Sequence, residues 1–341
     1  MTKAFITGLS GTTLTAAERD FIRAERPWGF ILFRRNIETS AQVSALTSQL
    51  REVLGEGGAP ILVDQEGGRV QRFGPPNWPL YPAGAAFGKL YGLDPALGLR
   101  AAWLSARLIA DDLAEVGVNV DCLPLADVPI PGANDVIGNR AYGHNPKTVA
   151  VIARAVTEGL VDGGILPILK HIPGHGRAMA DSHLSLPVVN TPRNELESID
   201  FAAFRPLGDL PMAMTAHVVF STYDNVHPST TSATMIERVI RGFIGFQGLL
   251  MSDDVGMNAL AGSIAERSRA LLAAGCDMVL ACSGEADEMH QVAREAPELS
   301  GMALQRAKAA LASRKAARPF DRKAARAELD GLISRLGAAS A

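Results

Sequence analysis

Short apolar runs alternate along the chain with longer stretches in which apolar residues recur at helical spacing. Eight of the short runs are rich in Val, Ile and Leu and predict buried strands, at residues 4–7, 29–33, 60–64, 118–123, 165–170, 212–216, 248–252 and 277–281. The longer stretches predict helices at residues 40–54, 97–116, 146–162, 195–204, 232–242 and 265–274. Apolar strands that alternate with helices are typical of a parallel sheet covered on both faces.

Eight strand–helix units favour a closed (β/α)8 barrel, the TIM-barrel fold, over an open doubly wound sheet. An open sheet would need a glycine-rich phosphate loop after its first strand, but residues 8–11 (GLSG) and 67–69 (GGR) lack that spacing. Polar residues stand at or just after the predicted strand ends, where the active face of a barrel lies: Asp64, Asp121, Lys170, His171, His217, Asp253 and Asp254. We predict one catalytic domain over residues 1–341, with loop insertions and a helical C-terminal tail from about residue 300.

Composition narrows the range of partners. The chain of 341 residues is 47% hydrophobic and 20% charged, which is typical of a globular protein with a large core. A net charge of -3 without a basic stripe argues against nucleic acid or an anionic membrane, so we expect a small-molecule substrate and a monomer. Neither a signal peptide nor a run of about 18 apolar residues is found, which favours the cytoplasm. Cys122, Cys276 and Cys282 are expected to be buried thiols.

Titratable side chains are most concentrated in residues 170–176 (KHIPGHG) and 181–183 (DSH), directly after an apolar run. Three of the chain's seven histidines fall here, and the usual pKa of histidine, about 6.5, suits proton transfer near neutrality. Asp181 and His183, one residue apart, can meet in a turn, where the carboxylate would accept a hydrogen bond from the imidazole and fix its tautomer.

The strand at residues 248–252 ends in Asp253 and Asp254, whose side chains point to opposite faces if the strand continues. One carboxylate can then face the barrel mouth while the other binds backbone. A carboxylate opposite a protonatable group across a cleft is the arrangement that cleaves glycosides.

Two polar loops and one metal site are further candidates. Residues 64–72 (DQEGGRVQR) and 138–143 (GNRAYG) offer Asp and Arg side chains that could bind sugar hydroxyls, or could be ordinary surface loops. A zinc site could be built from four side chains: His171, His175, His183 and Asp181. The chain lacks H-E-x-x-H, and Lys170 would put an ammonium beside the cation, so we expect neither a metal nor a cofactor.

Taken together, these segments resemble the glycoside hydrolase family 3 β-N-acetylglucosaminidases, single-domain cytoplasmic enzymes of bacterial cell-wall recycling. The matching motifs occur in the family's order, at residues 64–72, 137–140, 170–176, 181–183 and 252–254. The resemblance implies Asp253 as the nucleophile, His183 as the acid/base and Asp181 as its partner. It also implies a set of residues that holds the N-acetylglucosamine ring: Asp64, Arg72, Arg140, Lys170 and His171.

The chain departs from the family pattern at three places. Ile172 stands where the family usually has Phe, Asn139 where Asp is common, and residues 255–257 (VGM) where Leu-Ser-Met is usual. No departure removes an implied catalytic side chain.

The resemblance implies a retaining β-N-acetylhexosaminidase that removes terminal β-linked N-acetylglucosamine from peptidoglycan fragments (GlcNAc-anhydromuramoyl-peptides) through a glycosyl-aspartate. Because a neutral histidine does not repel an anion, a β-N-acetylglucosaminide phosphorylase is an alternative. A non-catalytic sugar-binding protein and a metal-dependent amide hydrolase are further alternatives.

Overall fold

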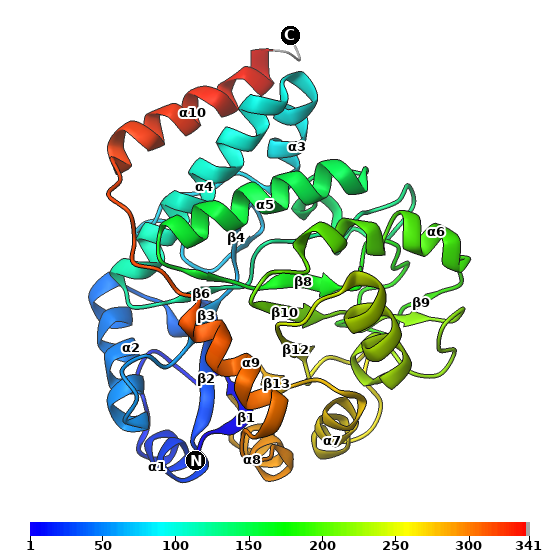
Figure 1. Ribbon diagram of the computed structural model, residues 1–341. Coiled ribbons are helices and arrows are strands. Elements are labelled where there is room, and N and C mark those ends of the chain that lie inside the picture. Colours follow the sequence, from blue (N-terminus) through cyan, green and yellow to red (C-terminus); the bar gives the residue numbers. More distant parts are fainter. Residues whose placement is uncertain (339–341) are drawn as a thin grey trace.

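A parallel sheet closes into a barrel in the computed structural model, which describes residues 1–338 (Figure 1). The strands are β1 (Lys3–Thr7), β2 (Pro27–Leu32), β3 (Ile61–Val63), β6 (Val120–Asp121), β7 (Leu166–Pro167), β8 (Leu169–Ile172), β10 (Met212–Thr215), β12 (Leu249–Asp254) and β13 (Met278–Ala281). Their order is β7-β6-β3-β2-β1-β13-β12-β10-β8. Because β7 and β8 are halves of one stretch, the barrel has the eight strand positions that the sequence predicts. The predicted (β/α)8 fold is confirmed.

The strands are apolar on both faces because each one separates two cores. Ile6, Ile31 and Leu62 belong to the cluster inside the barrel, whereas their neighbours Phe5 and Phe30 pack outward against the helices. Helix α9 (Gly301–Ala312) adds two alanines to the inner cluster, and the segment before it pairs with the backbone of the first strand. The amino-terminal end of the barrel is thereby covered, and the polar residues gather at the other end.

The helices surround the barrel (Figure 1). Their bounds are α1 (Ala16–Glu25), α2 (Ser40–Leu54), α3 (Gly84–Leu93), α4 (Pro95–Glu115), α5 (Pro146–Asp162), α6 (Arg193–Ser198), α7 (Ile264–Ala274), α8 (Ala286–Glu295), α9 and α10 (Arg322–Ala338). Two predicted helices have the same bounds in the structure because strong caps define them. Thr39 caps α2, which ends at a left-handed Gly55, and Asn145 caps α5 ahead of Pro146.

Several predicted elements differ in extent from those in the structure. The helix predicted over residues 195–204 ends at Ser198, because Asp200 turns inward to accept a hydrogen bond from Arg177 (2.6 Å), and short 3-10 turns follow. The strand predicted to end at Lys170 runs on to Ile172, so that Lys170 and His171 lie on β8 and not in a loop. The pattern also missed α1, α3 and α8, and the helix predicted over residues 232–242 is a π-type helix at Met235–Ile244.

The proline-rich segment after Arg72 is ordered because it buries its aromatic side chains. Phe73 and Trp78 pack edge to face, with ring centroids 4.9 Å apart. Tyr81 donates to buried Asp112 (2.5 Å), which also binds Arg322 of α10. The C-terminal helix therefore holds this segment against the barrel.

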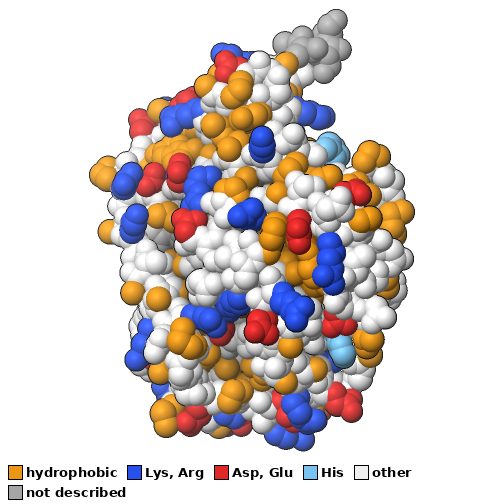
Figure 2. Space-filling view, turned by 45° about the vertical axis from the view of Figure 1, so that its right-hand side comes forward, with side chains coloured by type: hydrophobic (Ala, Val, Ile, Leu, Met, Phe, Trp, Pro, Cys, Tyr) orange, Lys and Arg blue, Asp and Glu red, His pale blue; other side chains and the backbone are white. Residues whose placement is uncertain are grey.

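Charged side chains of both signs are mixed over the face that Figure 2 presents. The three cysteines are buried free thiols, as predicted. Within residues 1–338, none of the helices combines the length and apolar character needed to cross a membrane.

Candidate active site

A cavity of about 150 Å³ opens at the carboxyl end of the barrel strands. Seven predicted site residues line it: Asp64, Arg72, Arg140, Lys170, His171, His183 and Asp253. The eighth, Asp181, does not line the cavity but binds His183. A larger cavity of about 720 Å³ lies between α3 and the loop at residues 129–145, and it contains none of the eight.

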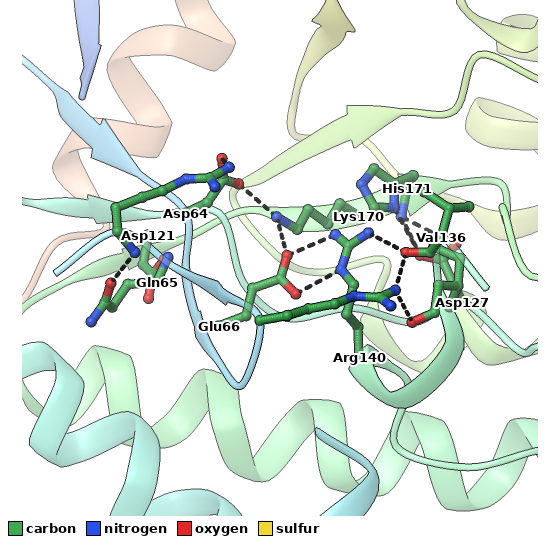
Figure 3. A network of polar contacts seen from close by, with 12 residues as sticks. Asp64, Gln65, Glu66, Asp121, Asp127, Val136, Arg140, Lys170 and His171 are labelled. Carbon is green, nitrogen blue, oxygen red and sulfur yellow. Dashed lines mark hydrogen bonds and ion pairs between the residues drawn. The ribbon is translucent and has the colours of Figure 1, made fainter. Parts of the chain in front are cut away.

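A buried network of ion pairs forms one wall of the cavity (Figure 3). Lys170 Nζ lies 2.8 Å from Asp64 Oδ1 and 2.7 Å from Glu66 Oε1. Arg140 binds both oxygens of Glu66 in a fork, with distances of 2.9 Å and 2.8 Å. Arg72 Nη2 donates to Asp64 Oδ2 (3.1 Å). Each carboxylate therefore bridges two cations, which fixes the direction of all five side chains.

Three separate chain segments bring this network together. Asp64 follows β3, and Glu66 lies in β4 (Gln65–Gly67), which forms a hairpin with β5 (Val70–Gln71). Asp121 at the end of β6 anchors the hairpin, because its Oδ1 accepts the N–H of Gln65 (3.0 Å). The network members thus come from the end of β3 and the hairpin after it, from β8, and from the 3-10 turn at Gly138–Arg140.

The network keeps its members charged. Burial alone would lower the pKa of Lys170, but the carboxylates of Asp64 and Glu66 raise it well above its usual value. Burial would likewise raise the pKa of Asp64, yet Lys170 and Arg72 bring it below its usual range. Burial would also lower the pKa of Arg140, but the carboxylate of Glu66 raises it above its usual value. The cavity wall therefore presents fixed charges to a ligand.

A buried aspartate orients His171. The Nδ1–H of His171 donates to Asp127 Oδ2 (2.8 Å), and Asp127 Oδ1 accepts the N–H of His175 (2.6 Å). This contact leaves Nε2 of His171 for the cavity that the ring lines. Sequence reasoning missed Asp127 and Glu66 as site residues, although Asp127 is the only charged residue between Asp121 and Asp135, which is a usable signal.

The adjacent carboxylates of Asp253 and Asp254 have different surroundings. Burial would raise the pKa of Asp253, but His171 and His217 lower it, so that this carboxyl group is ionised in the cavity. Asp254 Oδ1 instead accepts the backbone N–H groups of Gly256 (3.1 Å) and Cys282 (3.0 Å), and burial raises its pKa to about 6. Both carboxyl groups line the cavity, but Asp254 is held by backbone N–H groups, whereas nearby histidines keep Asp253 ionised.

His217 holds the end of β12 in place. Its Nε2–H donates to the carbonyl of Asp254 (3.0 Å), and its Nδ1 lies 2.7 Å from Thr230 Oγ1. Burial lowers the pKa of His217. The ring therefore braces the backbone beside Asp253.

Asp181 and His183 form a hydrogen-bonded pair at the mouth of the cavity. His183 donates both its backbone N–H (2.9 Å) and its Nδ1–H (2.8 Å) to Asp181 Oδ1. Burial alone would raise the pKa of Asp181, but these hydrogen bonds lower it. The His183 side chain is 66% exposed, and its Nε2 is left as the nitrogen that can exchange a proton with a ligand.

The three histidines of the zinc alternative have separate partners: Asp127 for His171, Ser182 for His175 and Asp181 for His183. In the described part of the chain, no group of three or more His, Cys, Asp or Glu side chains is placed to hold a metal ion. The four proposed zinc ligands therefore do not converge.

Most of the chain is similar to known proteins. Residues 6–313 match the family model described as the glycosyl hydrolase family 3 N terminal domain. A β-hexosaminidase of Alkalilimnicola ehrlichii is 41% identical over 280 residues, which cover 81% of this chain and 79% of that protein. A β-hexosaminidase of Bordetella avium is 38% identical over 281 residues, with 81% and 79% covered.

A solved structure agrees with these relatives. NagZ from Neisseria gonorrhoeae, in complex with N-trifluoroacetyl-D-glucosamine, superposes with a TM-score of 0.86 and 32% identity over 98% of both chains. The model match, the curated relatives and the superposition point to one enzyme class. The chain thus belongs to glycoside hydrolase family 3 and is a glycosidase of the β-hexosaminidase type.

Proposed function

We propose that this β-hexosaminidase is a retaining enzyme that removes terminal β-linked N-acetylglucosamine from peptidoglycan fragments, GlcNAc-anhydromuramoyl-peptides. The observation that carries the proposal is the pairing of an ionised Asp253 with a histidine, His183, on the same cavity. A nucleophilic carboxylate and a proton carrier are the two groups that a retaining glycosidase needs. The gonococcal relative was solved in complex with N-trifluoroacetyl-D-glucosamine, which supports an N-acylated glucosamine as the sugar that this enzyme releases.

In the first proposed step, a carboxylate oxygen of Asp253 attacks the anomeric carbon. The N–H of Asp254 donates to Asp253 Oδ1 (2.8 Å), which leaves Oδ2 to attack. A C–O ester bond forms, the glycosidic C–O bond breaks, and Nε2–H of protonated His183 gives its proton to the leaving oxygen. Asp181 stabilises the imidazolium before the transfer and keeps the ring oriented.

In the second step, the now neutral His183 accepts a proton from water through Nε2 as the water oxygen attacks the anomeric carbon. The ester bond to Asp253 breaks, the carboxylate is restored, and the sugar leaves with its original configuration. One histidine thus acts first as acid and then as base.

The charged wall is proposed to bind the sugar ring. Asp64 can accept from ring hydroxyls, whereas Arg72, Arg140 and Lys170 can donate to them, and Nε2 of His171 faces the same space. Because the ion pairs already fix these side chains, little conformational entropy is lost when a sugar binds.

Arg140→Ala is expected to weaken binding of N-acetylglucosamine-like inhibitors by about 1.5–3 kcal/mol, the scale of a lost charge-assisted hydrogen bond. Isothermal titration calorimetry measures the change directly. Arg23→Ala is the control, since Arg23 is exposed and pairs with Asp20 on α1. Unchanged inhibitor affinity in Arg140→Ala would exclude a contact between Arg140 and the sugar.

The proposed reaction is tested with an aryl β-N-acetylglucosaminide, with and without phosphate, followed by NMR of the first-formed sugar. We expect free β-N-acetylglucosamine in both cases. A sugar 1-phosphate would make the enzyme a phosphorylase, and a first-formed α-anomer would exclude the retaining mechanism. A parallel assay with GlcNAc-anhydromuramoyl-peptide and with chitobiose tests the substrate class, for which we expect higher kcat/KM on the muropeptide.

We further propose that the enzyme acts as a monomer in the cytoplasm, where recycled muropeptides would reach it. Size-exclusion chromatography with light scattering and fractionation of the native host test these two points.

A further inference from the structure

Ser182 is the one buried side chain in the turn that carries the proposed acid/base. Of residues 179–186, only Ser182 is buried, at 2% exposure. The turn is otherwise closed on itself, because the carbonyl of Asp181 accepts the N–H groups of Leu184 (2.9 Å) and Ser185 (3.0 Å). The position of the turn on the barrel therefore depends on what Ser182 contacts.

Two hydrogen bonds fix Ser182 from opposite sides. Its Oγ lies 3.0 Å from His175 Nε2, and its carbonyl oxygen accepts the N–H of Ala259 (3.1 Å). Ala259 belongs to the loop that follows β12, the strand that ends with Asp253. Ser182 thus connects the turn both to the loop after β8 and to the loop that follows Asp253 in the chain.

His175 is built to donate to Ser182. The ring is buried, and its Nδ1 has no hydrogen-bond partner within residues 1–338. Burial, with the nearby His171 adding to it, lowers the pKa of His175 to about 4, so the ring is neutral near pH 7. A buried N–H without a partner is costlier than a buried acceptor without one, so the proton resides on Nε2 and points at Ser182 Oγ.

Asp127 connects this bond to the sugar side of the cavity. One oxygen of Asp127 accepts the backbone N–H of His175 (2.6 Å), and the other accepts Nδ1–H of His171 (2.8 Å). The two imidazole rings also meet edge to face, with centroids 5.8 Å apart. The line of contacts therefore runs from a wall of the sugar cavity to the turn with Asp181 and His183.

We propose that the His175–Ser182 hydrogen bond is a positioning device that holds the Asp181–His183 turn over Asp253, a role that rests on the proposed acid/base function of His183. Neither His175 nor Ser182 touches the reacting atoms. Each acts through the placement of His183. A displacement of about 1 Å in a catalytic group is enough to cost about a hundredfold in rate.

The experiment measures kcat/KM for aryl β-N-acetylglucosaminides whose leaving groups range from 2,4-dinitrophenol to phenol. Ser182→Ala and His175→Phe each remove one partner, and Phe keeps a ring in the buried site. We expect both to lower kcat/KM about tenfold to a hundredfold for the phenyl substrate, which needs a proton, and less than about threefold for the dinitrophenyl substrate. Inhibitor affinity should stay unchanged, and His175→Gln, which keeps a donor, should recover part of the loss.

The double variant distinguishes the loss of one shared hydrogen bond from a general loss of stability. If the two side chains act through one bond, Ser182→Ala with His175→Phe should lose no more than the larger single effect. Ser185→Ala is the matched control, because its exposed side chain lies in the same turn and should leave kcat/KM unchanged. An equal loss for all leaving groups, or a fully additive double variant, would overturn the positioning role.

The same assay on His183→Ala separates this inference from the proposed function. If His183→Ala shows a steep leaving-group dependence while Ser182→Ala matches Ser185→Ala, only the positioning inference fails. If His183→Ala shows no such dependence, the acid/base assignment itself is wrong.

Discussion

Asp253→Asn is expected to abolish turnover of every substrate, with a loss of about 10⁴-fold or more, the scale seen when a residue of a cooperating catalytic set is removed. The amide cannot form the glycosyl ester, because its nitrogen and oxygen are poor nucleophiles. Substrate binding should survive, since the ion-pair wall of Asp64, Glu66 and Lys170 does not include Asp253. Stopped assays with a dinitrophenyl substrate, together with inhibitor titration, check both points.

Asp254→Asn is the matched control for this variant. The amide oxygen of Asn can accept the same N–H groups of Gly256 and Cys282, and the hydrogen bond from His217 goes to the backbone carbonyl. We expect Asp254→Asn to keep most of its turnover. Equal losses in the two variants would mean that the strand end, and not the charge on Asp253, is what catalysis requires.

His183→Ala is expected to lower kcat/KM by about 10²–10⁴-fold on glycosides with poor leaving groups, the usual contribution of general acid–base catalysis. An activated aryl leaving group needs no proton, so the first step should survive and the glycosyl-enzyme should accumulate. Added azide needs no general base, and it should therefore restore turnover as the glycosyl azide. A pre-steady-state burst and product analysis measure these effects, and the absence of both would contradict the role of His183.

The strand pattern was sufficient to predict the barrel and the end at which the polar residues meet. Strong caps, such as Asn145 before Pro146, also set helix bounds that the structure reproduces. Near Asp200 the prediction failed because a tertiary contact with Arg177 overrides the helical pattern. Periodicity along the chain does not contain such a contact between distant segments.

Seven of the eight residues named from the sequence line one cavity in the structure, but the contacts that connect them were not predictable. Glu66 and Asp127 were missed because their importance lies in which side chain each one faces across the barrel, Arg140 and His171 respectively. Those directions depend on strand register and on the β4–β5 hairpin. Likewise, the sequence places Ser182 between two candidate catalytic residues but gives no sign that its hydroxyl meets His175.

The most direct measurement is to trap the covalent intermediate with a slow fluorinated N-acetylglucosamine analogue. Intact-protein mass spectrometry should show an increase of one sugar residue, and proteolytic digestion should then place the sugar on Asp253. The same treatment of Asp253→Asn should leave the mass unchanged, whereas Asp254→Asn should still be labelled. A label on Asp254 or Glu66, or a sugar product of inverted configuration, would contradict Asp253 as the nucleophile.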